Sequence, residues 1–60
     1  MWTVIYIAPS AKIAERIQHR LTDEGFLCKV REAKVSKQYE ILVPESELHE
    51  VQEVLSTILH

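Results

Sequence analysis

A pattern of one strand followed by one helix occurs twice in this chain. Shifting the sequence by 34 positions superposes apolar residues of the first half on apolar residues of the second half: Ile7 on Ile41, Ala14 on Leu48, Ile17 on Val51 and Leu21 on Leu55. The same period is typical of an all-helical repeat, but segments in which apolar residues alternate exclude that fold. The chain is therefore predicted to contain two strand–helix units.

The first unit covers the beginning of the chain. Residues 2–8 are mostly β-branched or aromatic and lead into Pro9, which indicates a strand followed by a helix start. Ser10 is the expected N-cap, and Gly25 stands where a helix commonly ends in a left-handed residue. We therefore expect a strand over residues 2–8 and a helix over about Ala11–Glu24.

The second half of the sequence predicts two more strands and a second helix. Alternating apolar side chains indicate a strand over residues 26–33 and another over residues 39–43, which ends at a proline. The connection over residues 34–38 contains no glycine for a tight turn. Apolar residues then recur at helical spacing, so the second helix is expected from Glu45 or Ser46 to Leu59.

The predicted element order is β-α-β-β-α, in a single domain over residues 1–60. A split β-α-β arrangement places the third strand in the centre, antiparallel to both others. The expected fold class is α+β: a two-layer ferredoxin-like domain whose three-stranded antiparallel sheet has the strand order 1-3-2 and carries two helices on one face. Such a sheet lacks a fourth strand beside the first, so the first strand is expected to have an open edge.

Because the domain is small, association with a second copy would add to its stability. A domain of this length buries only about 60% of the surface of its unfolded chain, and the single cysteine cannot form an internal disulfide. The first strand is apolar on both sides, so we expect a partner to cover it, most simply as a homodimer. The predicted self-association residues are Trp2, Val4, Tyr6, Leu27 and Leu42. A monomer that tolerates a short open edge is the alternative.

Parts of the chain resemble a known family. Three parts of the chain resemble a small bacterial domain of unknown function whose members are described as prokaryotic signal-transducing proteins. They are the opening strand, the helix end Leu21–Phe26 (LTDEGF) and especially the segment Tyr39–Leu48 (YEILVPESEL) with Val51 and Leu55. The resemblance implies a ferredoxin-like β-α-β-β-α domain with a signal-transducing role. Short chains of this kind sometimes carry the name glutamate decarboxylase, but sixty residues cannot enclose pyridoxal phosphate.

Charge is distributed unevenly along the chain. Residues 1–37 hold all seven lysines and arginines and four acids, a net charge of +3, whereas residues 38–60 hold five acids and no base. A basic stripe on the first helix (Lys12, Arg16, Arg20) and an acidic stripe on the second (Glu47, Glu50, Glu53) are expected to meet within one chain or across a dimer, or else to lie in solvent.

A second functional hypothesis is based on a basic segment of the chain. Its candidate anion-binding residues are Lys29, Arg31, Lys34 and Lys37. They predict a binder of nucleic acid or another polyanion as the alternative function. The sequence pI of about 5.8 and the lack of interleaved aromatic residues count against nucleic acid.

No motif for catalysis, a cofactor or a metal is present in the sequence. His19, His49 and His60 are too dispersed to form a metal site. Cys28 shares the expected core face of its strand with Phe26 and Val30, as expected of a buried, inert thiol. The carboxylates of the second helix lie on its polar side, whereas general acid–base catalysis needs a desolvated member. The apolar N-terminal run is too short for a membrane span, and the lone cysteine suits a reducing compartment. We therefore expect a non-catalytic, cytoplasmic interaction or regulatory module.

Overall fold

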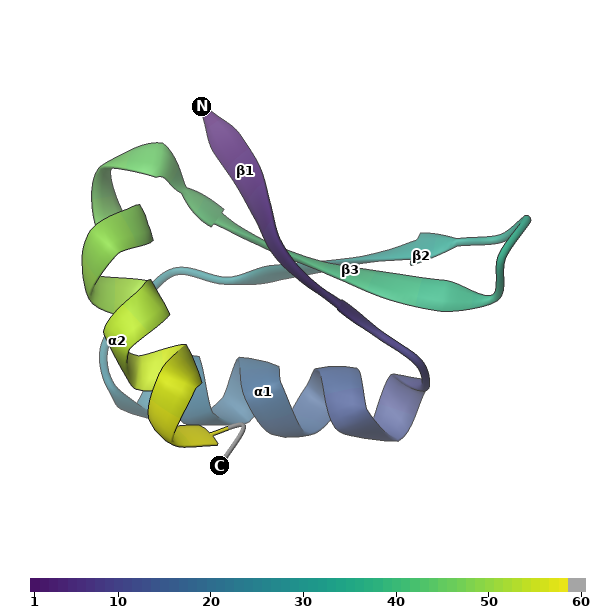
Figure 1. Cartoon of the computed structure of the whole chain (residues 1–60), viewed down its shortest axis with the longest axis horizontal. Coiled ribbons are helices and arrows are strands. Elements are labelled where there is room, and N and C mark those ends of the chain that lie inside the picture. The colour runs from purple at the N-terminus through teal and green to yellow at the C-terminus, as the bar shows by residue number, and fades with distance from the viewer. Residues whose placement is uncertain (59–60) are drawn as a thin grey trace.

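The computed structural model of the chain describes residues 1–58, which contain strands and helices in the order β-α-β-β-α (Figure 1). The bounds are β1 Trp2–Ala8, α1 Ala11–Asp23, β2 Lys29–Ala33, β3 Gln38–Pro44 and α2 Leu48–Ile58, with a 3-10 turn over Glu45–Glu47 before α2. The strands form one antiparallel sheet in which β3 lies between β1 and β2. The predicted α+β class, element order and 1-3-2 strand order are confirmed.

The hydrophobic core lies between the sheet and the helices. On β3, Ile41 and Val43 are fully buried, whereas the alternate residue Glu40 lies on the other face, where Arg31 of β2 pairs with it. Both helices lie on the Ile41 side, and α1 runs along the sheet (Figure 1). The buried cluster consists of Ala8, Ala14, Ile17, Leu21, Ile41, Val43, Val51 and Leu55. Burial of one stripe from each helix against one sheet face is what holds the two layers together.

Local hydrogen bonds set both ends of α1. The Ser10 hydroxyl oxygen accepts the N–H of Ile13 at 3.3 Å, as predicted for an N-cap. At the other end, the N–H of Gly25 donates to Thr22 and the N–H of Phe26 donates to Leu21. This pair of bonds is a Schellman motif, and Gly25 has the left-handed φ of 92° that the motif requires.

β2 begins later than the sequence predicts, at Lys29. The backbone groups just before it are bonded elsewhere: the N–H of Leu27 donates to the Glu47 carboxylate, and the carbonyl of Cys28 accepts from the Gln18 side chain. These contacts tie the segment to the helical layer instead of to β3. For the second helix, the predicted C-terminal residue Leu59 lies outside the described residues.

A four-residue turn over Lys34–Lys37 joins β2 to β3, and Ala33 pairs with Gln38 at its base. The connection is shorter than predicted because Gln38 belongs to β3. In place of a glycine, Lys37 adopts the left-handed conformation, with φ of 57°.

A β-bulge interrupts β1 and changes which side chains share a face. Val4 pairs with Leu42 and Tyr6 pairs with Ile41, so Ile5 has no partner and the alternation shifts after it. Tyr6 therefore lies on the helix side of the sheet, packed against the core. Simple alternation along residues 2–8 predicts that Tyr6 shares a face with Trp2 and Val4, and this prediction is wrong because of the bulge.

Candidate functional site

The sheet face turned away from the helices is the main surface without cover within the described residues, and we call it the open face. Cross-strand pairing builds it in rows, since paired residues of an antiparallel sheet point to the same side. Its side chains are Trp2, Val4 and Ile7 from β1, Gln38, Glu40, Leu42 and Pro44 from β3, and Lys29, Arg31 and Ala33 from β2. The β1 margin of the open face is apolar and the β2 margin is basic.

The apolar margin is partly exposed. Trp2 is 37% exposed, Val4 39% and Ile7 50%, and the three come from one strand that has a neighbour on one side only. Leu42 lies between Val4 and Lys29 and is only 8% exposed. An apolar patch beside an unpaired strand edge is typical of a surface that another chain covers.

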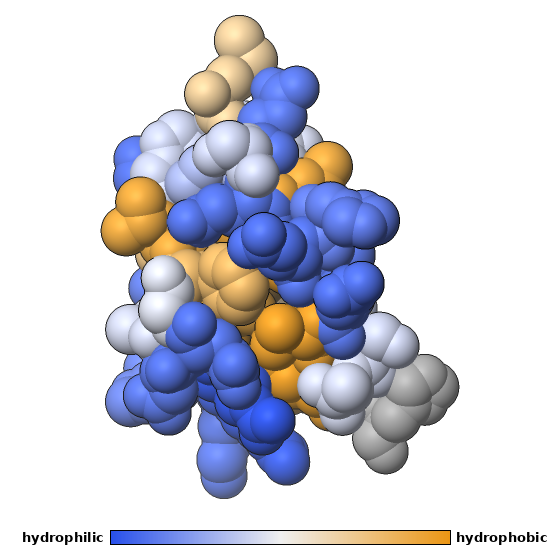
Figure 2. Space-filling model, turned by 90° about the vertical axis from the view of Figure 1, so that its left-hand side faces the viewer, coloured by the Kyte–Doolittle hydropathy of each residue, from blue (hydrophilic) through white to orange (hydrophobic). Residues whose placement is uncertain are grey.

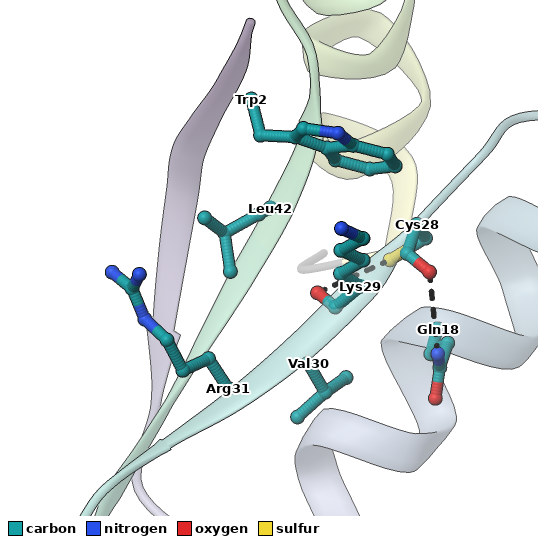
Figure 3. Close-up of a pocket in the computed structure, with 7 residues that line it drawn as sticks. All are labelled: Trp2, Gln18, Cys28, Lys29, Val30, Arg31 and Leu42. Atoms are coloured by element: carbon teal, nitrogen blue, oxygen red, sulfur yellow. Dashed lines mark hydrogen bonds between the residues drawn. The ribbon is translucent and has the colours of Figure 1, made fainter.

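The basic margin is already engaged inside the chain. The Nζ atom of Lys29 lies 4.5 Å from the centroid of the Trp2 ring, which is a cation–π contact across the sheet (Figure 3). Arg31 donates from Nε to Oε1 of Glu40 at 2.7 Å, on the neighbouring strand. Each of these two positive charges therefore has a partner before any ligand arrives.

An open hollow of about 620 Å³ borders β2. Trp2, Lys29, Arg31 and Leu42 line it from the open face, and Gln18, Cys28 and Val30 line it from the helix side (Figure 3). The Gln18 amide donates to the carbonyl of Cys28 at 3.4 Å, so the helix partly covers this margin of the sheet. The hollow thus wraps around a strand edge and is not an enclosed pocket.

Burial makes Cys28 a poor nucleophile. The side chain is half-buried, and desolvation raises the pKa of its thiol above the ordinary value of 9.0. The thiol also lies 3.9 Å from the carbonyl of Lys29, as a weak donor. A thiol whose charged form is disfavoured is unsuited to nucleophilic catalysis.

The structure separates the predicted self-association residues. Trp2, Val4 and Leu42 share the open face, whereas Tyr6 lies on the opposite side. Leu27 is exposed but precedes β2, so it lies outside the sheet. Ile7 takes the place of Tyr6 on the open face. No signal in the apolar run over residues 4–7 reveals the bulge, because neither alternation places a charged residue in the core.

The predicted anion-binding residues divide into two pairs. Lys29 and Arg31 are on the open face, and Lys34 and Lys37 are exposed in the turn. Glu40 lies directly beside Arg31, which lowers the positive potential there.

The helix surfaces show few ion pairs. Figure 2 shows that the side of the molecule carrying α2 is mainly hydrophilic, with hydrophobic surface visible between the polar side chains. Within residues 1–58 the ion pairs are Arg31–Glu40 and Arg20–Glu24, the latter at 3.7 Å between the last turn of α1 and its C-cap residue. Neither joins the basic stripe of α1 to the acidic stripe of α2, so contact between the stripes within one chain is not observed among these residues.

No metal-binding group of three or more His, Cys, Asp or Glu side chains occurs in the described part of the chain. His19 and His49 are exposed on separate helices, and His60 lies outside the described residues. Neither helix among residues 1–58 has the length and apolarity needed to cross a membrane.

The fold and this surface define a class: a small α+β domain of ferredoxin-like type whose antiparallel sheet has three strands within the described residues. Comparison of the chain with protein-family models, with curated proteins and with solved structures found no significant match.

Proposed function

We propose that this chain is a small, non-catalytic interaction or regulatory module of the cytoplasm that self-associates through its open sheet. The observation that carries the proposal is the apolar margin of the open face, formed by Trp2, Val4 and Ile7 beside the unpaired edge of β1. Burial of such a margin against a second copy removes apolar surface from water and adds to the stability of a domain that buries little surface alone.

A regulatory role agrees with the resemblance of Tyr39–Leu48 to the prokaryotic signal-transducing family. That segment holds the central strand and the start of α2, so the resemblance rests on residues that build the fold. Fold alone does not define function, and the surface chemistry therefore carries more weight than the resemblance.

Solution mass measured across concentration tests the proposal. We expect a dimer at high micromolar concentration and its loss in Val4→Lys, because a charge placed on the apolar margin is costly to bury. Val35→Lys is the matched control: the same substitution lies in the turn, where the side chain is fully exposed at 103%. A wild-type chain that stays monomeric at high micromolar concentration contradicts the proposal.

Polyanion binding through residues 29–37 is the alternative function, supported by the exposed Lys34 and Lys37 in the turn. The Glu40 carboxylate accepts a hydrogen bond from the Arg31 guanidinium and offsets its positive charge. The substitution Glu40→Gln removes that negative charge, so it is expected to strengthen any polyanion binding. Affinity for single- and double-stranded oligonucleotides at low ionic strength tests it, with Lys34→Gln as the variant that weakens binding. Absence of binding, or binding insensitive to salt, removes the alternative.

A further inference from the structure

The two edges of the sheet differ in chemistry. β1 contains no charged residue between Trp2 and Ala8, whereas β2 carries Lys29, Arg31 and Glu32 in five residues. Charged side chains on an edge strand discourage pairing with other strands, and their lack leaves an edge available. Only one of the two edges is therefore chemically open to a further strand.

Helix α1 also covers part of the β2 margin. The Gln18 side chain reaches the Cys28 carbonyl, immediately before the strand. Within the described residues, β1 has its hydrogen-bonded neighbour β3 on one side and no element on the other. The N–H and C=O groups on that outer side are a template for an added strand.

Symmetry strengthens the contrast between the edges. When a strand pairs antiparallel with its own copy about a two-fold axis, its residues face residues of the same strand. Pairing of β2 with itself brings Lys29 and Arg31 of the two copies together, and like charges directly opposite are destabilising. Pairing of β1 with itself brings together only apolar and neutral side chains.

Stacking of two open faces is less favourable than edge pairing. It places the charges of Lys29, Arg31 and Glu40 in the interface, away from water. Edge pairing leaves these charges exposed, because Lys29 and Arg31 lie on the far strand β2 and Glu40 lies on the central strand β3, none of them on the outer side of β1. The charge distribution on the open face thus selects the edge as the contact.

We propose that two copies of this chain join β1 to β1 in antiparallel fashion, so that one continuous sheet runs through the dimer. The inference rests on the proposed self-association and specifies where it occurs. The antiparallel arrangement places Ile7 of one copy near Trp2 and Val4 of the other, so the exposed apolar margins merge. Both β1 edges are used, and the remaining β2 edges are charged, so assembly stops at the dimer.

Backbone amide exchange of the full chain, followed by nuclear magnetic resonance, tests the edge directly. At a concentration where about 90% of chains are dimeric, we expect outward amides of residues 2–8 to exchange about tenfold more slowly than in dilute samples, because only the undimerised tenth exposes them. A mixture of labelled and unlabelled chains should also show contacts between backbone protons of β1 from different copies.

Two matched variants each add one lysine to the open face, one at its β1 margin and one at its β2 margin. Val4→Lys should abolish the dimer, and Ala33→Lys, at the β2 margin, should leave it intact. A dimer without slowed exchange in β1, or one lost equally in both variants, overturns edge pairing while self-association stands. A chain that is monomeric throughout overturns both proposals. Native amide spectra of the variants confirm that each one folds.

Discussion

The ammonium group of Lys29 lies 4.5 Å from the centre of the Trp2 ring, although the two residues belong to opposite edge strands of the sheet. The Trp2 side chain therefore extends across β3, beside Leu42 (Figure 3). This contact links the first strand of the chain to the strand that follows α1. It also directs the indole ring toward β2, away from the outer side of β1, where we propose that two copies pair.

Removal of the charge at Lys29 tests the cation–π contact. We expect Lys29→Met to lower the free energy of unfolding by about 0.5–1 kcal/mol, since the contact is partly exposed. Trp2 is the only tryptophan, so its fluorescence emission reports the change locally. Lys34→Met, in the turn, is the control and should alter neither urea unfolding nor emission. Equal effects of the two variants contradict the contact.

The bulge at Ile5 predicts opposite roles for two adjacent residues. Tyr6 packs against the core, so Tyr6→Ser should lower the free energy of unfolding by about 2–3 kcal/mol. Ile7 is half exposed, so Ile7→Ser should change the free energy of unfolding of the monomer by less than about 1 kcal/mol. Urea unfolding of dilute samples measures both, and the reverse order of the two effects would mean that the strand has no bulge.

The left-handed conformation of Gly25 predicts a cost for any side chain there. A Cβ atom at this position meets no other group within 4 Å, so the effect comes from backbone strain alone. We expect Gly25→Ala to lower the free energy of unfolding by about 1–2 kcal/mol. Thr22→Ala, in the last turn of α1, is the control, because alanine favours the helix. Thermal or urea unfolding compares them, and a neutral Gly25→Ala rules out the Schellman end.

Burial of Cys28 predicts a pH dependence of reactivity and stability. Because desolvation raises the pKa of the thiol, the folded chain should react with iodoacetamide more slowly near neutral pH than the urea-unfolded chain. The folded state holds the thiol proton more tightly, so this group's contribution to stability is complete below the unfolded pKa and declines as pH rises through the folded pKa.

A serine substitution provides the control for the titration of the Cys28 thiol. Cys28→Ser removes the thiol, and its stability should fall less steeply than that of the wild type as the pH rises above 9.0, the ordinary thiol value. Unfolding in urea at several alkaline pH values gives the comparison. Identical slopes for the two chains would show that the thiol is exposed in solution.

Much of the fold follows from local patterns in the sequence. Ser10, Gly25 and the apolar stripe through Ala14, Ile17 and Leu21 define α1 within one residue of its observed bounds, because caps and helical periodicity act over a few neighbouring positions. β1 also has the predicted bounds, because its run of β-branched and aromatic residues is likewise a local pattern. The central position of β3 follows from the element order and from the short connections available.

The features of the fold that the sequence did not predict depend on contacts between distant segments. The late start of β2 depends on Gln18 and Glu47, which bond to the backbone before Lys29 from other elements. The face on which Tyr6 lies depends on the register of β1 against β3, and a one-residue bulge reverses it.

The candidate site shows the same division between sequence and tertiary structure. An apolar first strand could be read from the residues themselves, because hydrophobicity belongs to each side chain. The partners of Lys29 and Arg31, and the place of Ile7 on the open face, required the sheet, because these side chains meet only when separate strands pair. Hydrophobic pattern and caps therefore determined which elements form, and strand register determined which of their side chains meet.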